Sequence, residues 1–194
     1  MADDSRINFT NQFLIAMPGM AEGTFTGAVV YLCEHTEKGA LGLVINKPID
    51  IKLKNLFEKV ELSLTRDDLA DAPVYFGGPV QTERGFVLHE RQIDAASPYN
   101  STLAIPGGHL DMTTSKDVLE ALSNGAGPKK ILVTLGYSGW GAGQLEDEIG
   151  RNGWLTVDAQ PEVIFDTPIE QRYDRALSLL GFDPRMLSQE AGHA

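Results

Sequence analysis

Val29-Val30-Tyr31-Leu32-Cys33 and Ile131-Leu132-Val133-Thr134-Leu135 are two apolar stretches rich in β-branched and aromatic residues. This composition is typical of strands. Strands whose apolar residues continue without alternation are usually covered on both faces of their sheet. We therefore expect both stretches to be buried strands, with the rest of the chain arranged around them.

Shorter segments of similar composition, bounded by glycine or proline, predict further strands. The predicted strands cover residues 12–16, 27–34, 40–46, 74–76, 85–89, 102–105, 130–136, 154–157 and 163–165. Lys38-Gly39 separates two of them and predicts the turn of a hairpin.

Helices are predicted near residues 53–60, 114–125 and 143–149, and from Thr167 to a left-handed stop at Gly181. The last begins with a full capping box, Thr167-Pro168-Ile169-Glu170. Asp183-Pro184 predicts a final turn through Leu187. Strands and helices mix irregularly, which favours an α+β fold with a mixed sheet over a doubly wound parallel sheet.

The composition predicts one ordinary domain. The 194 residues are 42% hydrophobic and 22% charged, close to a soluble globular average. We assign residues 1–10 to a flexible N-terminal segment, 11–187 to the domain and 188–194 to a frayed tail. No apolar run approaches the roughly 18 residues of a spanning helix, and the first residues lack a signal-peptide pattern. The one cysteine fits a reducing compartment, so we expect a cytoplasmic protein without a membrane segment.

The charge argues against a nucleic-acid-binding protein. There are 16 Lys and Arg against 27 Asp and Glu, a net charge of -11. Proteins that bind duplexes neutralise phosphates with a basic patch. The densest basic stretch, residues 47–59, is interleaved with carboxylates. We expect no direct binding to DNA.

The histidines and the cysteine do not form a metal-binding pattern. Zinc sites need clustered Cys and His at short spacing, and His35, His89, His109 and His193 are far apart. Cys33 and His35, two residues apart, are expected on the same face of a strand. Two ligands do not make a site, so we expect a buried thiol and an imidazole at a strand end. We predict neither a metal nor a cofactor.

Gly136-Tyr137-Ser138-Gly139-Trp140 lies between an apolar strand and a helix, the context of the nucleophile elbow of hydrolases. However, tryptophan replaces the final glycine of that motif. The only histidine after Ser138 is His193, the penultimate residue. A hydrolytic or nucleotide-handling enzyme that uses Ser138, or the carboxylates Glu146 and Glu148, remains the alternative hypothesis.

Trp140-Gly141-Ala142-Gly143-Gln144 opens the helix near 143–149, and glycines before a helix can expose amides to an anion. Three carboxylates follow at once, at positions 146–148, where they would repel a phosphate. No lysine follows the glycines, so there is no Walker pattern. The same carboxylates are an alternative site for a divalent cation.

The leading hypothesis is a ligand or partner surface built from two glycine-rich turns. Such turns expose backbone amides, and aromatic side chains beside them offer faces for contact. The residues of this predicted surface are Phe76, Gly77, Gly78, Pro79, Tyr137, Ser138, Gly139, Trp140, Gly141, Gly143, Gln144 and Glu146. The alternative is structural: Trp140 and Trp154 fill the core, and the glycines allow close backbone contact.

The chain resembles the YqgE/AlgH family of bacterial proteins over about residues 11–180. The resemblance rests on the segments 13–18, 30–35, 39–48 (Gly-Ala-Leu-Gly-Leu-Val-Ile-Asn-Lys-Pro), 76–80, 135–137, 139–146 (Gly-Trp-Gly-Ala-Gly-Gln-Leu-Glu) and 165–168, with Asn152 and Trp154. It implies an α+β fold whose sheet curls into a partly closed, barrel-like body with flanking helices.

The resemblance also implies a cytosolic protein of a largely uncharacterised family whose members are labelled transcriptional regulators, after a link to alginate production. The family supplies no agreed catalytic residues. It often has alanine where this chain has Ser138, which weakens the hydrolase alternative. Combined with the acidic charge, the resemblance favours a non-enzymatic protein that regulates transcription indirectly, through a protein or small-molecule partner.

Overall fold

The structure, a computed structural model, describes residues 7–18, 23–91 and 98–181. Its strands are β1 (Gln12–Ala16), β2 (Val29–Thr36), β3 (Gly39–Val44), β4 (Pro48–Lys52), β5 (Pro73–Phe76), β6 (Val80–Glu90), β7 (Thr102–Ala104), β8 (Leu110–Thr113), β9 (Ile131–Gly141) and β10 (Trp154–Asp158). Its helices are α1 (Leu53–Lys59), α2 (Asp117–Ser123), α3 (Gln144–Gly150), α4 (Pro161–Phe165) and α5 (Arg172–Ser178), with a 3-10 turn η1 (Ile169–Gln171) before α5. The turn predicted over 183–187, the tail 188–194 and residues 1–6 of the N-terminal segment lie outside the described residues.

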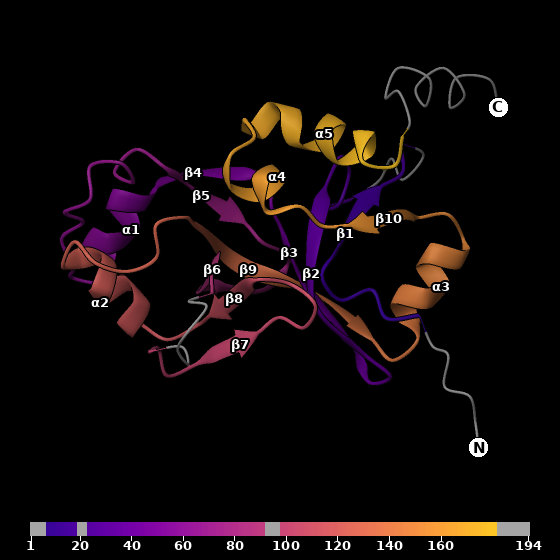
Figure 1. The fold of residues 1–194 in the computed structure, drawn as a ribbon, viewed down its shortest axis with the longest axis horizontal. Helices are drawn as coiled ribbons and strands as arrows, with labels where there is room; N and C mark the ends of the chain where they lie inside the picture. The colour runs from indigo at the N-terminus through magenta and orange to yellow at the C-terminus, as the bar shows by residue number, and fades with distance from the viewer. Residues whose placement is uncertain (1–6, 19–22, 92–97, 182–194) are drawn as a thin grey trace.

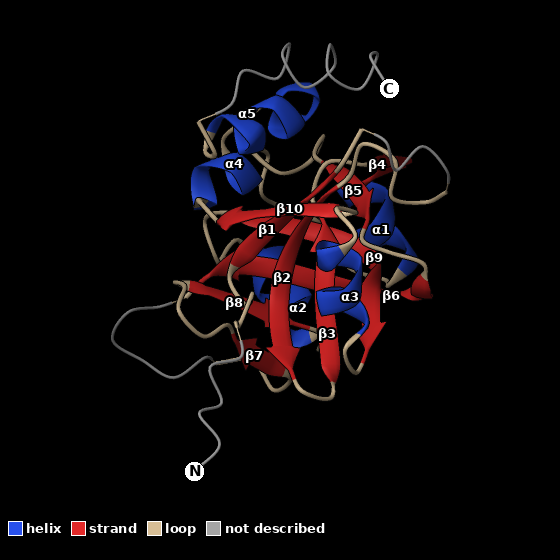
Figure 2. Ribbon diagram, turned by 90° about the vertical axis from the view of Figure 1, so that its right-hand side faces the viewer, coloured by secondary structure: helices blue, strands red, loops and turns tan. Residues whose placement is uncertain are grey.

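The strands form one mixed sheet that curls into a partly closed barrel (Figures 1 and 2). Their order is β10-β1-β2-β3-β9-β6-β8-β7, and β4 pairs with β5. The pairing of β5 with β9 is parallel, and the other described pairs are antiparallel. The α+β fold with a mixed sheet, predicted from the sequence pattern, and the curl that the family resemblance implies are both confirmed.

The long strand β9 joins the two halves of the sheet. Its first part, from Ile131 to Tyr137, pairs with β6 and β5, and its end, from Ser138 to Gly141, pairs with β3. At Gly136 the backbone has a φ of 77°, a conformation that favours glycine. The chain therefore changes partners just after this glycine, between Tyr137 and Ser138, and the pairing with β3 extends β9 beyond the predicted strand 130–136.

The two stretches that predict central strands are covered on both faces, as expected. In β2, Val30 and Leu32 pack on the side of α3, whereas Tyr31 and Cys33 lie in the interior of the curl. The interior cluster also contains residues from the distant half of the sheet, such as Leu110 of β8. Burying a side chain of this size contributes about 1.5–3 kcal/mol. Because the sheet curls, side chains from its two distant halves bury one another in a single interior cluster.

Three groups of helices complete the three apolar clusters. Helices α4 and α5 cover the interior cluster, α3 packs with Trp140 and Trp154, and α1 and α2 cover the outer side of β6 and β9. Figure 1 shows α1 with α2 at one end of the molecule and α3 at the other. None of the helices in the described ranges has the length and apolar character needed to cross a membrane.

Two predictions near the C-terminus are wrong. Residues 163–165 are not a strand but the end of α4, because Pro161 starts a helical turn that packs against α5. The capping box at Thr167 does not form. The Thr167 hydroxyl donates to the Glu162 carbonyl at 3.0 Å, and the α-helix begins only at Arg172, after η1. The left-handed stop at Gly181 is confirmed by its φ of 82°.

The remaining helices and the hairpin agree with their predicted positions. α1, α2 and α3 lie within a few residues of the predicted segments, and Glu37-Lys38 joins β2 to β3. Strands β4 and β8, in contrast, were not predicted. β4 is short and alternates between half-buried and exposed residues, and β8 contains a buried Asp111, so neither has the composition on which the prediction relied.

Candidate functional site

The two glycine-rich turns lie together where β5 ends against β9. The Gly77 N–H donates to the Leu135 carbonyl at 2.9 Å, and the Gly77 carbonyl accepts the Ser138 hydroxyl at 3.0 Å. A Cβ on Gly77 would lie 2.2 Å from the Gly136 carbonyl oxygen. Gly78 is buried beside it. The glycines therefore let two backbone segments cross in contact. The N–H and the carbonyl of Gly77, in a turn that the sequence had suggested for a ligand, are hydrogen-bonded within the protein instead.

The rest of the predicted surface is divided between buried and exposed positions. Ser138 is fully buried, which removes its hydroxyl from any substrate. Phe76 and Tyr137 are half-buried, whereas Pro79, Gly139, Gly141, Gly143, Gln144 and Glu146 are exposed. The structure brings the two turns together, but it does not make of them one open surface.

Trp140 fills the core. It is 6% exposed and lies 6.1 Å from Trp154 and 6.2 Å from Phe25, measured between ring centroids. Glu148 Oε1 accepts the indole N–H groups of Trp140, at 3.2 Å, and of Trp154, at 3.1 Å. Its Oε2 accepts the amide of Gln144 at 2.9 Å. Both oxygens of Glu148 thus serve to hold α3 on the two tryptophans.

A β-bulge in β2 places a histidine beside α3. The register of β2 against β3 shifts between Leu32 and Glu34, so that Cys33 is an extra residue. A one-residue shift reverses the face to which side chains point. His35 therefore pairs with Ala40 on the side of α3, whereas Cys33 stays in the interior. The expectation that these two side chains share a face is wrong for this reason.

His35 is 8% exposed, and both of its ring nitrogens have partners. The Phe9 N–H donates to Nδ1 at 3.0 Å, so Nδ1 carries no proton. Nε2 then carries the proton and donates it to Oε1 of Glu146, on the first turn of α3. The Phe9 ring stacks on the imidazole with 5.5 Å between centroids. The imidazole that joins these two elements is consequently neutral.

A cavity of about 630 Å³ opens beside these side chains. It lies between the N-terminal segment, the end of the β2–β3 hairpin and α3. We call it the His35 cavity, and its lining residues are Ile7, Asn8, Phe9, His35, Thr36, Glu37, Glu146, Ile149 and Gly150. Its volume is within the range of about 300–1,000 Å³ that is usual for small-molecule sites.

Of the predicted surface residues, Glu146 is the one that lines the His35 cavity. Sequence reasoning placed His35 at a strand end but missed its contact with Glu146. It also missed Phe9 and Ile149. The sequence offered only the two separate motifs that contain His35 and Glu146. The contact between these residues depends on the bulge in β2 and on the pairing of β3 with β9, which neither motif encodes.

The Cys33 thiol is buried and out of reach of a substrate. Burial raises the pKa of the Cys33 thiol, and the Glu34 carboxylate raises it further. Its Sγ faces the Tyr31 carbonyl at 3.7 Å, so it is an inert core residue. Within residues 7–18, 23–91 and 98–181, no group of three His, Cys, Asp or Glu side chains is placed to hold a metal ion.

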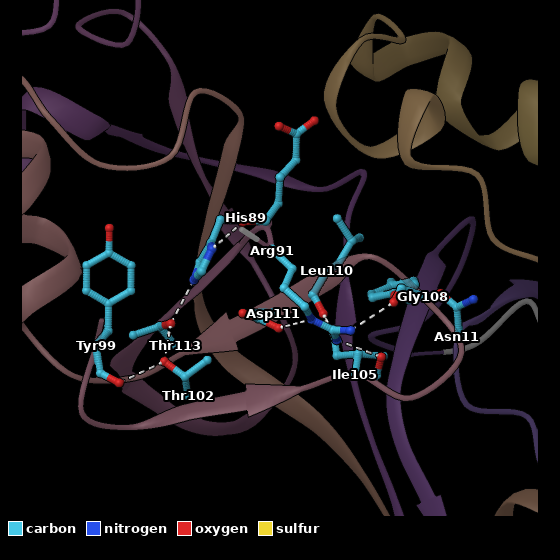
Figure 3. Close-up of polar contacts among 12 residues, drawn as sticks. Asn11, His89, Arg91, Tyr99, Thr102, Ile105, Gly108, Leu110, Asp111 and Thr113 are labelled. Carbon is cyan, nitrogen blue, oxygen red and sulfur yellow. Dashed lines mark hydrogen bonds and ion pairs between the residues drawn. The ribbon is translucent and has the colours of Figure 1, made fainter. Parts of the chain in front are cut away.

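A second polar cluster, between β6, β7 and β8, is satisfied internally (Figure 3). The Arg91 guanidinium donates to Asp111 at 2.7 Å and to the carbonyls of Ile105, Gly108 and Leu110 at 3.0–3.2 Å. These contacts tie the loop after β7 to the sheet. Because every nitrogen of the guanidinium has a partner in the protein, this cluster is a structural clamp.

Comparison with known proteins places the chain among proteins of the same size. A family model described as AlgH-like matches residues 13–185. A UPF0301 protein of Ralstonia nicotianae is 66% identical over 191 residues, which are 98% of each chain. Another, of Variovorax paradoxus, is 67% identical over 198 residues, covering 100% of this chain and 99% of the relative.

Two solved structures have a similar fold. The solution structure of the AlgH protein from Pseudomonas aeruginosa superposes with a TM-score of 0.77 at 46% identity, and 100% of each chain is covered. A crystal structure of a protein from Corynebacterium diphtheriae superposes with a TM-score of 0.68 at 18% identity, covering 86% of this chain and 84% of that chain. The second likeness concerns the fold alone.

Proposed function

The chain belongs to the AlgH-like family, and from this premise we propose that it is a non-enzymatic cytoplasmic regulator that acts through a small molecule bound in the His35 cavity. On this proposal its influence on transcription is indirect, and a bound ligand, rather than a DNA contact, carries the signal. The observation that supports it is the cavity itself, which combines apolar walls with a buried histidine and two acidic residues, Glu37 and Glu146.

The geometry of the cavity favours binding over catalysis. A general base needs a free nitrogen or oxygen within hydrogen-bond reach of its substrate. His35 has none, because Phe9 occupies Nδ1 and Glu146 accepts the proton on Nε2. The proposed nucleophile Ser138 is buried and donates to a backbone carbonyl. His35 and Ser138 therefore hold neighbouring groups in place, and neither offers a free catalytic atom beside the Glu146 carboxylate, which is left as a binding group.

The walls of the cavity also favour a regulatory role. They come from three separate parts of the chain: the segment before β1, the tip of the β2–β3 hairpin and α3. A ligand that contacts all three would join elements that are held together here by His35 and its two hydrogen bonds. Binding would thus change the relative stability of these elements, and a partner protein could bind one of the resulting conformations more tightly than the other.

A thermal-shift screen of the full chain tests this proposal. The panel contains nucleotides, Mg²⁺, and small amines, carboxylates and alcohols. A ligand at ten times its dissociation constant adds about 1.4 kcal/mol to the free energy of unfolding. For a protein of this size we expect the melting temperature to rise by roughly 3–6 °C.

Two substitutions assign such a shift to the cavity. Ile149→Trp fills the cavity with an indole ring, whereas Arg151→Trp adds the same ring at an exposed position just after α3. We expect the shift to disappear in the first variant and to persist in the second. The proposal is wrong if no compound on the panel gives a concentration-dependent shift, or if the filled variant responds as the parent does.

A further inference from the structure

The hydrogen bonds of His35 leave the negative charge of Glu146 in place at the edge of the cavity. Because Phe9 donates to Nδ1, the imidazole is a neutral donor to Glu146 and not a cation. The Glu146 carboxylate is therefore oriented by His35 without being neutralised by it.

Part of this carboxylate remains open to a ligand. The Glu146 side chain is 46% exposed, and His35 engages one of its oxygens. Among the described residues, none forms a hydrogen bond or ion pair with Oε2 of Glu146. The Glu146 side chain lines the cavity, so its carboxylate is the acidic group that a donor placed there would meet beside His35. Carboxylates accept up to four hydrogen bonds, and a charged donor makes the strongest of them.

The described part of the lining contains no lysine or arginine. The nearest basic side chain in sequence, Arg151 just after α3, forms an ion pair with Asp147 at 3.3 Å, and neither residue lines the cavity. An anionic ligand would meet the Glu146 carboxylate with no described cation to compensate. A cationic ligand would gain a partner, and the net charge of -11 would assist its approach.

The other walls suit an apolar body. Ile7 is 69% exposed and is the large hydrophobic side chain most open to solvent in the described residues. Phe9 and Ile149 are half-buried and complete this wall. The face of an aromatic ring such as that of Phe9 also attracts a cation. A ligand with one charged end and one apolar end would cover Ile7 and satisfy Glu146 together.

We propose that the His35 cavity binds a small organic cation, with an ammonium group on Glu146 and an aromatic or alkyl body between Ile7, Phe9 and Ile149. This inference rests on the proposed function, since it names the ligand class of the same site. It assigns to His35 the role of a positioning residue, which holds the Glu146 carboxylate in place.

Three compounds with one phenyl body and different charge test the inference: 2-phenylethylamine, 2-phenylethanol and phenylacetate. Each is titrated into the full chain at neutral pH, and amide chemical shifts are followed by NMR. We expect the amine to bind at least about tenfold more tightly than the alcohol, since a hydrogen bond to a charged group contributes about 1.5–3 kcal/mol. We expect the largest shifts at Phe9, Glu146 and Ile149, and no saturable response to phenylacetate.

A pair of neighbouring substitutions separates local charge from the general acidity of the protein. Glu146→Gln keeps the shape of the side chain but removes its charge, and we expect it to weaken the amine about tenfold or more. Asp147→Asn removes the same charge one residue away, outside the cavity, and should change the affinity by less than about twofold. Melting temperatures of both variants establish that they are folded.

The outcomes distinguish this inference from the proposed function. If the alcohol or phenylacetate binds as well as the amine, or if the two variants behave alike, the ligand class is wrong while the cavity remains a binding site. If the amine does not bind at millimolar concentration, the ligand class is also wrong, and the wider thermal-shift panel then decides whether the cavity is a site at all.

Discussion

Cys33 has a large effect on the site although it takes no part in any chemistry. As the extra residue of a β-bulge, it turns His35 out of the interior and toward α3. Bulges often re-aim a side chain in this way beside functional sites. A strand without the bulge would direct an imidazole into the apolar interior, where its ring nitrogens would lack partners. One inserted residue thus produces the contact on which the proposed site depends.

His89 shows how a buried imidazole couples stability to pH. Its Nε2 lies 2.7 Å from the Thr113 hydroxyl, and its Nδ1 lies 3.0 Å from the Glu90 carbonyl (Figure 3). Burial lowers the pKa of His89, although the Glu90 carbonyl and the Asp111 carboxylate act in the opposite direction. The folded protein therefore holds this histidine neutral at a pH at which the unfolded chain already binds a proton.

The sign of the resulting pH dependence follows. The stabilisation is fully present above the unfolded pKa of about 6.5, and it is lost as pH falls from there toward the lower folded value. We expect His89→Gln to flatten the decrease in unfolding free energy below about pH 6.5, which can reach roughly 1.4 kcal/mol per pH unit for one group. Urea unfolding at a series of pH values measures it. His109→Gln, at an exposed position, should retain the slope of the parent; equal slopes in both variants would contradict the assignment.

At the scale of elements, the contact of β5 with β9 explains why the glycine motifs are where they are. β9 changes its partner from β6 to β3, and the turn after β5 crosses it at the same place. Side chains there would collide with backbone atoms, which cannot move aside as a flexible side chain can. The glycine-rich turns are therefore a requirement of the curled sheet.

A glycine substitution at this crossing should be costly. In Gly77→Ala the new Cβ would lie 2.2 Å from the Gly136 carbonyl oxygen and 2.4 Å from the Thr134 hydroxyl. Overpacking of this kind costs about 1–3 kcal/mol and sometimes more, and contact with backbone places it at the upper end. Gly85→Ala on β6 meets no atom within 4 Å and should change the unfolding free energy by less than about 1 kcal/mol. Chemical denaturation of both variants tests the difference, and comparable losses would disprove the crossing.

At the scale of the whole molecule, charge and shape limit the partners. The net charge of -11 opposes a polyanion over the entire surface, whereas the proposed cation site is a local use of the same field. The three helix groups cover the curled sheet from different sides, so that its apolar residues are mostly enclosed.

This charge predicts that the protein does not bind duplex DNA directly. Specific DNA-binding proteins typically reach dissociation constants of about 10⁻⁸–10⁻¹¹ M, with a large share of that affinity from phosphate contacts. At about 150 mM salt we expect no shift of a random duplex pool in gels at micromolar protein, with a basic DNA-binding protein as positive control. A sequence-specific complex in the nanomolar range would contradict this prediction and show that the protein contacts DNA itself.

Local sequence patterns were sufficient for most of the fold. The uninterrupted apolar runs of β2 and β9 indicated strands buried on both faces, and the position of α3 followed from its glycines and apolar spacing. These signals survive because burial and periodicity are properties of neighbouring residues. Residues 163–165 are the exception, since a strand-like Val-Ile-Phe run became helical when it packed against α5.

The sequence by itself determined the α+β class, the central strands and the acidic field, because each depends on composition or on short-range pattern. Only the tertiary structure decided that Ser138 and Trp140 are enclosed and that His35 meets Phe9 and Glu146. The physical reason is that those contacts join residues 26 and 111 positions apart, and they depend on a bulge and a strand crossing that no local pattern encodes.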